Sequence, residues 1–334
     1  MAKRKLSDHQ KSRIDKRQQQ HVEHHDSGDD KQSDSQLGPK TQGIVACHFG
    51  QQLDVEAVGG DQPGKSFRCF QRSNLPALVC GDRVVFQTDG ESSGVVVALE
   101  ERSSIFSRPV TGGGLKHVAS NIDLVLIVIA SVPQPFMNLV DRYLVAIESL
   151  NLTPALVINK ADLARSVDNS EISAMKALYS GLGYDVLEAS AKTGHGIVEL
   201  KETLKGKTTV IVGQSGVGKS SLINTLNPGL DAPVGALSAN RDKGTHTTTA
   251  AQLFHLDGCD LIDSPGIREF GLWHISQQQL LEGFTEFRPF LGLCKFRDCN
   301  HKNEPECALQ DAVASGAISK ERMESCFLIL GSLL

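Results

Sequence analysis

The sequence lacks any hydrophobic run long enough to cross a membrane. Its longest such run, Ile122 to Ala130, has the length of a strand and contains Asp123, whereas a membrane helix needs about 20 apolar residues. The N-terminus is rich in Lys and Arg and lacks the apolar core of a secretory signal peptide. These two absences predict a cytoplasmic protein with no membrane partner.

The chain is also poor in aromatic residues, at 5%, and its formal net charge of -5 is not basic. A mildly acidic protein has no overall attraction for nucleic acid, so any RNA binding must come from local patches. Eight cysteines among 334 residues do not make a disulfide scaffold. Three of them fall between residues 294 and 307, and in a reducing compartment such a cluster is typical of a metal site.

Residues 1–40 form a polar tail with few large apolar side chains, which predicts disorder. Basic residues dominate its first part and acidic residues its second. A basic arm favours an anionic partner such as RNA, and a solvated tail that only aids solubility explains the composition equally well. The basic residues are Lys3, Arg4, Lys5, Lys11, Arg13, Lys16 and Arg17.

Residues 41–110 contain five short alternating segments with turn residues between them, at 43–47, 53–58, 66–70, 82–86 and 94–99. Five short strands in so few residues predict a small β-barrel, and the five-stranded OB-fold is the simplest choice. Only four phenyl rings lie within the region of the five predicted strands, those of Phe49, Phe67, Phe70 and Phe86. Contacts to RNA shape or phosphate are therefore favoured over base stacking.

Strands and helices alternate over residues 111–274, beginning with the apolar run at 122–130. This alternation predicts an α/β domain with a mostly parallel sheet covered by helices on both faces. Ligands of such sheets bind beyond the carboxyl ends of the strands. Residues 275–334 are expected to form a mainly helical appended domain that encloses the cysteine cluster.

The segment Gly213 to Ser220 reads G-Q-S-G-V-G-K-S and fits the phosphate-binding pattern G-x-x-x-x-G-K-[ST]. It follows the apolar run 208–212 and precedes a helical pattern, which is the strand–loop–helix context that the motif requires. The backbone N–H groups would surround phosphate, Lys219 would reach the β- and γ-phosphates, and Ser220 would ligate Mg²⁺. The predicted nucleotide contacts are Gly213, Gln214, Ser215, Gly216, Val217, Gly218, Lys219, Ser220 and Ser221.

The base is identified by Asn159-Lys160-Ala161-Asp162, which follows the strand-like run 155–158. The Asp162 carboxylate can accept hydrogen bonds from N1–H and the 2-amino group of guanine. Adenine offers neither donor and would leave the carboxylate unpaired, at a cost of about 1–3 kcal/mol. Lys160 can cover the ring, and Ser190, Ala191 and Lys192 add a backbone N–H toward guanine O6. By itself N-K-x-D is a common tetrapeptide that could simply begin a helix, with Asp162 as its cap.

Asp263-Ser264-Pro265-Gly266 matches D-x-x-G at the end of another predicted strand. Asp263 would hold Mg²⁺ through water, and the Gly266 N–H would meet the γ-phosphate. Between the two phosphate motifs lies a threonine-rich stretch at 245–249. We expect a switch segment here, with Thr248 preferred over Thr247 and Thr249 as the Mg²⁺ ligand, although an edge strand would have a similar composition.

Ile267 stands where many GTPases place a water-orienting glutamine, so intrinsic hydrolysis should be slow. A neutral imidazole can accept a hydrogen bond from the attacking water, which makes His246 the candidate for this function. The alternative is that His246 only hydrogen-bonds within the switch. Together with Lys219 and Thr248, it completes the predicted catalytic set.

Cys294, Cys299, His301 and Cys307 have the spacing C-x₄-C-x-H-x₅-C. Three thiolates and one imidazole fill a tetrahedral Zn²⁺ shell and leave no position for water, which predicts one structural zinc ion. The alternative is a group of unrelated buried or surface thiols.

The order of the motifs is unusual, because the guanine motifs at 159 and 190 precede the phosphate motifs at 213, 245 and 263. A fold survives such a relocation of its termini when the original ends lie close together. The chain therefore looks like a circularly permuted P-loop GTPase. With its barrel and its C-terminal cysteines, it resembles the family of ribosome small-subunit-dependent GTPases known as RsgA or YjeQ.

This resemblance implies hydrolysis of GTP to GDP with Mg²⁺, stimulated by the 30S subunit during late small-subunit maturation. It also implies contacts between the barrel and 16S rRNA, and we expect a monomer. Three alternatives stay open at this point: a nucleotide-gated RNA-binding scaffold with negligible turnover, a permuted GTPase acting on the large subunit, and a generic P-loop ATPase.

Overall fold

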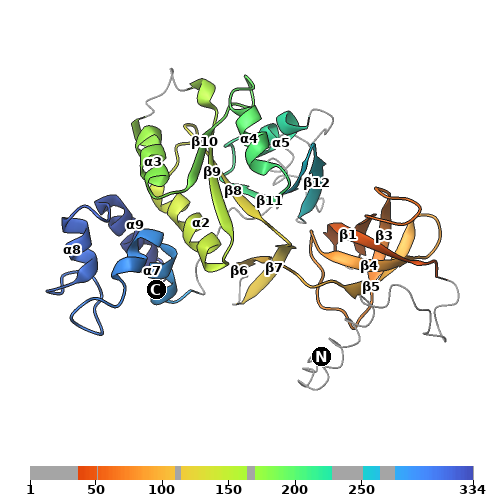
Figure 1. Ribbon diagram of the computed structural model, residues 1–334, viewed down its shortest axis with the longest axis horizontal. Coiled ribbons are helices and arrows are strands. Elements are labelled where there is room, and N and C mark those ends of the chain that lie inside the picture. Colours follow the sequence, from red (N-terminus) through yellow and green to blue (C-terminus); the bar gives the residue numbers. More distant parts are fainter. Residues whose placement is uncertain are drawn as a thin grey trace, which may run out of the picture.

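The computed structural model describes residues 37–50, 52–109, 114–163, 170–227, 251–263 and 275–333. Most of the polar tail lies outside these ranges. So do His246, Thr248 and Gly266, for which the sequence predicts roles at the phosphates. The described chain runs from a barrel at one end, through a central α/β part, to a helical part at the other end (Figure 1). Among the described residues, no helix has both the length and the apolar character needed to cross a bilayer.

The predicted five-stranded barrel is confirmed. Its strands follow the order β1-β2-β3-β5-β4, and β4 also pairs with β1, so the sheet closes on itself. Alternate side chains point inward and form one apolar core, with Leu53, Val55 and Phe86 fully buried. The strands are β1 Lys40–Phe49, β2 Gln52–Ala57, β3 Ser66–Gln71, β4 Arg83–Thr88 and β5 Ser93–Leu99.

A two-stranded hairpin follows the barrel and was not predicted from the sequence. It consists of β6 Ile105–Pro109 and β7 Leu115–Ser120. The buried Asp82 ties it to the barrel, because its carboxylate accepts hydrogen bonds from Ser120 Oγ at 2.6 Å and Arg102 Nε at 2.7 Å. The hairpin thus depends on a buried polar contact between distant segments, which no local pattern reveals.

The predicted parallel sheet forms the central part. Its strands β10 Asp185–Glu188, β9 Thr153–Asn159, β8 Leu124–Ala130, β11 Thr208–Gly213 and β13 Cys259–Asp263 lie side by side in that order and run parallel. Every residue of β8 is buried, as expected for a central strand covered on both faces. One further strand, β12 Gln252–Leu256, pairs antiparallel with β13 at the sheet edge.

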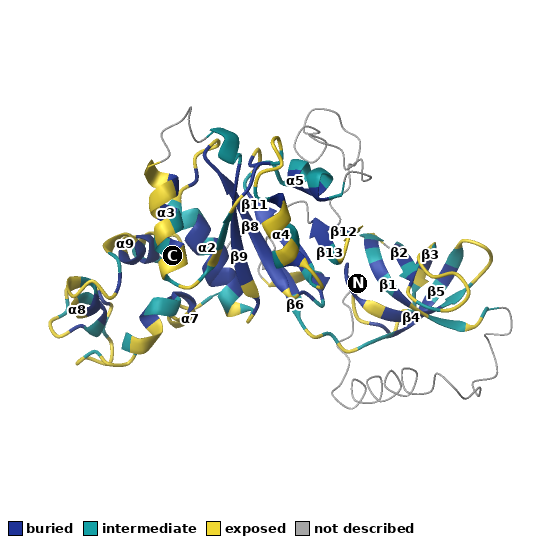
Figure 2. Ribbon diagram, turned by 45° about the horizontal axis from the view of Figure 1, so that its top comes forward, coloured by how far each residue is buried: buried dark blue, intermediate teal, exposed yellow. Residues whose placement is uncertain are grey.

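Within the described part of the chain, two helices cover each face of this sheet (Figure 2). Their apolar residues belong to two separate cores, one containing α2 and α3 and the other containing α4 and α5. The helices are α2 Met137–Ser149, α3 Ser170–Gly181, α4 Ile197–Leu204 and α5 Lys219–Leu226.

The barrel and the parallel sheet are joined edge to edge. Strand β1 pairs with β12 at Cys47 and Gln252, so one sheet of eleven strands runs through both parts. His255 of β12 strengthens this junction, since its ring nitrogens lie 2.9 Å from Glu56 of the barrel and 2.7 Å from Asp260 of β13. The hydrogen bond with Asp260 and the charge of Glu56 raise the pKa of His255 to about 9. The ring is therefore cationic at neutral pH and bridges two carboxylates.

The C-terminal part contains α7 Gln277–Gly283, a 3₁₀ helix η2 Thr285–Phe290, α8 Ala308–Ala314 and α9 Lys320–Gly331. Helices α7 and α9 pack on α2, and their apolar residues extend the core that lies on the α2 face of the sheet. Ser276 begins α7 with a reciprocal capping box to Gln279. The expectation of a mainly helical C-terminal part is confirmed.

A buried ion network crosses the contact between this part and the central sheet. Arg322 of α9 is fully buried and pairs with the buried Asp141 of α2. Its Nε also donates to Glu286 of η2 at 2.6 Å, and its guanidinium lies 4.3 Å from the ring centroid of Phe284. Tyr179 of α3 donates to Asp141 at 2.6 Å.

We predict that Arg322→Met lowers the free energy of unfolding by about 3–5 kcal/mol, because it leaves Asp141 and Glu286 buried without their counter-charge. Burial already raises the pKa of Asp141, so the deficit should shrink at lower pH, where the uncompensated carboxyl takes up a proton. Urea unfolding at two pH values measures both effects. Lys320→Met is the matched control, because Lys320 is exposed on the same helix. Equal stability of the two variants would contradict the prediction.

Candidate functional site

The glycine-rich loop connects β11 to α5, as the sequence predicts. Three of its glycines have positive φ angles: 141° at Gly213, 83° at Gly216 and 94° at Gly218. A Cβ atom at Gly213 would lie 2.2 Å from the carbonyl oxygen of Val128 in β8. The loop therefore needs glycine both for its backbone conformation and for its close approach to the neighbouring strand.

Lys219 is held against this loop at the first turn of α5. Its Nζ donates to the carbonyl oxygens of Gly213 at 2.8 Å and Gln214 at 2.7 Å. Asp263 ends β13 directly beside the loop, since it pairs in register with Ile211 of β11. Burial raises the pKa of Asp263, and the nearby charge of Lys219 opposes that rise. The structure thus places an ammonium and a carboxylate together at the carboxyl ends of β11 and β13.

Asn159 connects three of the predicted motifs. It ends β9, and its Nδ2 donates to the carbonyl oxygen of Val217 in the glycine-rich loop at 2.8 Å. Its Oδ1 accepts from the backbone N–H of Ala191 at 3.3 Å. The side chain is 1% exposed, so these bonds are protected from water. A Cβ atom at Gly218 would come within 2.4 Å of Nδ2, which shows how closely the loop and this asparagine approach.

Lys160 follows in the left-handed region, with a φ of 62°, which is unusual for a residue with a side chain. This conformation accompanies a return of the side chain to the loop, where Nζ donates to the carbonyl oxygen of Gly216 at 2.6 Å. It also donates to Val132 O at 2.6 Å. Local backbone strain of this kind is often found at functional sites.

Asp162 lies in the short 3₁₀ helix Ala161–Leu163 and faces the second guanine motif. Its Oδ1 accepts from Ser190 Oγ at 2.6 Å, and Lys192 Nζ lies 3.9 Å from Oδ2. Thr225 of α5 adds a contact that the sequence did not suggest, by donating to the carbonyl oxygen of Ala191 at 3.1 Å. All of these residues come from segments that follow the carboxyl ends of parallel strands, where ligands of α/β sheets bind.

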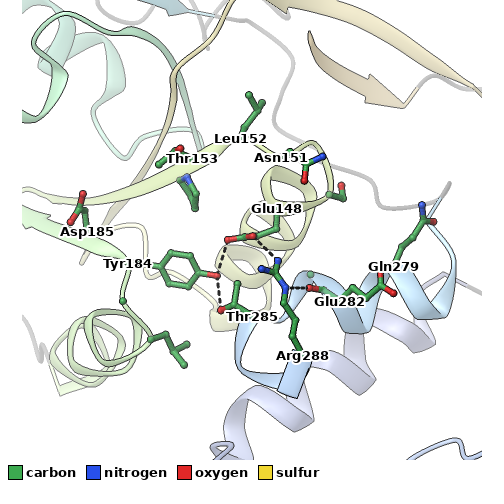
Figure 3. Close-up of a pocket in the computed structure, with 15 residues that line it drawn as sticks. Glu148, Asn151, Leu152, Thr153, Tyr184, Asp185, Gln279, Glu282, Thr285 and Arg288 are labelled. Carbon is green, nitrogen blue, oxygen red and sulfur yellow. Dashed lines mark hydrogen bonds and ion pairs between the residues drawn. The ribbon is translucent and has the colours of Figure 1, made fainter. Parts of the chain in front are cut away.

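A large cleft in the described residues lies at the amino ends of the strands β9 and β10, away from the carboxyl ends that the predicted motifs follow. It has a volume of ≈ 960 Å³ and opens between the starts of β9 and β10 and the helical C-terminal part (Figure 3). Arg288 donates to Glu148 across it at 2.7 Å, and Tyr184 contacts both Glu148 and Thr285 at 3.4 Å. None of its lining residues belongs to the predicted nucleotide motifs.

The four predicted zinc ligands meet in the C-terminal part. Their ligand atoms all lie within 4.8 Å of one another. His301 Nδ1 is 3.4 Å from the sulfurs of both Cys294 and Cys307, which are 3.9 Å apart. Sulfurs in a tetrahedral shell with Zn–S bonds of about 2.3 Å would be separated by roughly 3.8 Å. Burial lowers the pKa of His301, which favours the neutral imidazole with a lone pair for a metal. This donor set and its spacing fit a four-coordinate metal site.

Comparison with known proteins identifies the family. The model of the RsgA GTPase family matches residues 99–273. The chain is 49% identical, over its full length and 97% of the relative, to the small ribosomal subunit biogenesis GTPase RsgA of Hahella chejuensis, and 48% identical to that of Ectopseudomonas mendocina. The crystal structure of YjeQ from Thermotoga maritima is 34% identical and covers 88% of this chain and 98% of its own, with a TM-score of 0.70.

This chain belongs to the RsgA GTPase family. A second solved structure, described as YloQ, a circularly permuted GTPase, covers 91% of the chain at 26% identity with a TM-score of 0.67. Both the permuted fold and the assignment as a GTP-hydrolysing enzyme are thereby confirmed. For this RsgA-family member the generic ATPase interpretation is not supported.

Proposed function

We propose that this RsgA-family GTPase acts in the cytoplasm, as a monomer, in biogenesis of the small ribosomal subunit. It binds the 30S particle through 16S rRNA, and the particle stimulates hydrolysis of GTP to GDP. Full-length similarity to small-subunit biogenesis GTPases supports the choice of particle. The observation that carries the nucleotide assignment is the pair of hydrogen bonds by which Asn159 joins the glycine-rich loop to the second guanine motif.

In this proposal Asp162 pairs with the donor edge of guanine, and Ser190 fixes the carboxylate by donating to one of its oxygens. Lys160 covers the ring while its ammonium stays bound to the carbonyl of Gly216. Ala191 and Lys192 complete the base site through their backbone. The guanine is thus recognised by acceptors and donors that are already held in place by protein contacts.

The phosphates are surrounded by the backbone N–H groups of residues 213–221, and Lys219 compensates the charge that develops on the γ-phosphate. Mg²⁺ would be held by Ser220, Asp263 and Thr248, and it supplies further positive charge to the phosphates. Gly266 is assigned to the γ-phosphate and His246 to the attacking water. Thr248, Gly266 and His246 lie outside the described residues, so their roles rest on sequence alone.

The cluster of Cys294, Cys299, His301 and Cys307 is proposed to hold one structural Zn²⁺. We predict that Cys307→Ser reduces bound metal from one ion per chain toward none and lowers the stability of α8 and α9, because metal binding contributes directly to folding of small sites. Elemental analysis of purified protein measures the metal, and far-UV circular dichroism measures the helices. Cys259→Ser, outside the cluster, should keep the metal. A wild-type protein that contains no zinc would contradict the assignment.

Phosphate release in the presence of 30S subunits, of 50S subunits and of neither tests the proposed function. We expect stimulation by 30S alone, and activating partners can accelerate such enzymes by up to ~10⁵-fold. Stimulation by 50S would indicate a large-subunit factor instead. Binding to 30S without any acceleration would favour the RNA-binding scaffold with negligible turnover.

A further inference from the structure

The barrel exposes two of its phenyl rings and buries the other two. Phe49 is 38% exposed and Phe70 is 50% exposed, whereas Phe67 and Phe86 are at 4% and 0%. The buried pair forms part of the barrel core, with ring centroids 5.2 Å apart. The exposed pair has no such structural purpose within the described residues.

The two exposed rings belong to one row across the sheet. Phe49 of β1 pairs with Gln52 of β2, and Gln52 pairs with Phe70 of β3. Neighbouring strands are about 4.8 Å apart, so one strand with a polar amide separates the two phenylalanines. The row lies on the outer surface of the barrel. The adjacent residues along the same strands, Leu53 in β2 and Cys69 in β3, are fully buried and so point to the opposite side.

Arg68 shares this surface, since it lies two residues before Phe70 on the same strand. Its guanidinium carbon is 5.1 Å from the ring centroid of Phe49. Asp54 of β2 holds it there, with Arg68 Nε 2.5 Å from Oδ1, and the Arg68 side chain is still 48% exposed. The surface therefore presents two partly exposed rings and one fixed, accessible guanidinium, which lies over the Phe49 ring.

The two carboxylates of this surface each have a cationic partner, although Glu56 shares its partner with Asp260. Asp54 pairs with Arg68, and Glu56 pairs with the cationic His255. They therefore repel phosphate less than free carboxylates would. The polar tail that leads into β1 carries seven basic residues within its first 17 positions, which adds attraction for a polyanion.

We propose that the row of Phe49, Gln52 and Phe70, together with Arg68, is a stacking surface for unpaired nucleotides of rRNA. Aromatic rings and guanidinium planes stack on unpaired RNA bases, and strands 2 and 3 form the nucleic-acid face of OB-folds. The proposal rests on the proposed function and makes it more specific. It also revises the sequence-based expectation that contacts to shape or phosphate predominate, because half of the barrel's phenyl rings point outward.

Affinity for purified 30S subunits, measured with Phe70→Ala, Phe49→Ala and the double variant, tests this surface. Loss of a base–aromatic stack is expected to weaken binding about 5- to 150-fold per base, at an unchanged slope of log affinity against log salt. Basal GTP turnover without 30S should stay at the wild-type value. Val58→Ala is the control, because Val58 is a 63% exposed apolar residue elsewhere on the barrel.

Two further variants identify the kind of partner. Phe70→Trp should bind 30S like the wild type, because it keeps a stacking face, whereas Phe70→Leu should bind as weakly as Phe70→Ala. Full rescue by leucine would overturn the proposal in favour of an apolar protein contact. Wild-type affinity of the double alanine variant would overturn it too. Failure of the wild type itself to bind 30S would instead refute the proposed function.

Discussion

Lys219→Ala is expected to lower GTP hydrolysis by roughly 10²–10³-fold, in the presence and absence of 30S subunits. The magnitude is that of removing one preorganised group that stabilises charge in a transition state. The geometry supports a role for Lys219 at the phosphates, because its ammonium donates hydrogen bonds to the carbonyls of Gly213 and Gln214 in the glycine-rich loop. The ammonium also lies close enough to Asp263 to influence the pKa of that carboxyl. Single-turnover phosphate release measures the effect on chemistry.

Lys205→Ala provides the control for this prediction, since Lys205 is a 69% exposed lysine after α4 and lies outside the nucleotide motifs. Thermal unfolding of both variants shows whether the fold is kept. If the Lys219 variant retained hydrolysis stimulated by 30S, the assignment of this loop to the phosphates would be wrong.

Asp162→Asn is expected to weaken GTP binding by on the order of 10³-fold, because two hydrogen bonds from guanine lose their charged acceptor and one amide donor faces the 2-amino group. The fold should be preserved, since the asparagine carbonyl can still accept from Ser190 Oγ, which lies 2.6 Å from Oδ1 in the native protein. Titration with fluorescent GDP and GTP analogues gives the affinities.

Xanthosine triphosphate separates lost recognition from lost structure. Xanthine carries a carbonyl where guanine has its 2-amino group, so it can accept the hydrogen bond that the new amide donates. We therefore expect the Asp162→Asn variant to prefer xanthosine triphosphate and the wild type to prefer GTP. Equal preferences in the two proteins would show that Asp162 does not contact the base.

The two appended parts of the molecule attach to different regions of the GTPase domain. The barrel continues the sheet through β12, whose partner β13 ends in Asp263. The helical C-terminal part packs on α2, where Arg322 pairs with Asp141. Hydrogen-bonded strands thus connect the barrel to the strand that ends in Asp263, whereas the C-terminal part is attached through α2.

Much of this fold could be predicted from sequence because its signals are local. The apolar run in β8, the alternation in β2 and β3, and the strand–loop–helix around Gly213 each depend on neighbouring residues. The β6–β7 hairpin was missed because Asp82, Arg102 and Ser120 stabilise it across 38 positions of sequence. The junction of β1 with β12 was missed for the same reason, since about 200 residues separate the strands.

In the candidate site, too, the local motifs could be predicted from the sequence and the contacts between distant segments could not. The motifs indicated which residue types to expect, and the chemistry of guanine is the reason why we predict that the aspartate at position 162 contacts the base. The bonds that assemble the site were not predictable, because Asn159 and Thr225 make them across segments whose pairing only the fold determines. No pattern in the sequence indicates that Arg322 is buried, since a lone arginine on an amphipathic helix is normally exposed.

A crystal structure with Mg²⁺ and a non-hydrolysable GTP analogue tests the central claim most directly. The account predicts N1 and the 2-amino group of guanine within hydrogen-bond distance of the Asp162 carboxylate, and the β- and γ-phosphates enclosed by residues 213–220. A base bound away from Asp162, or phosphates bound anywhere other than this loop, would contradict it.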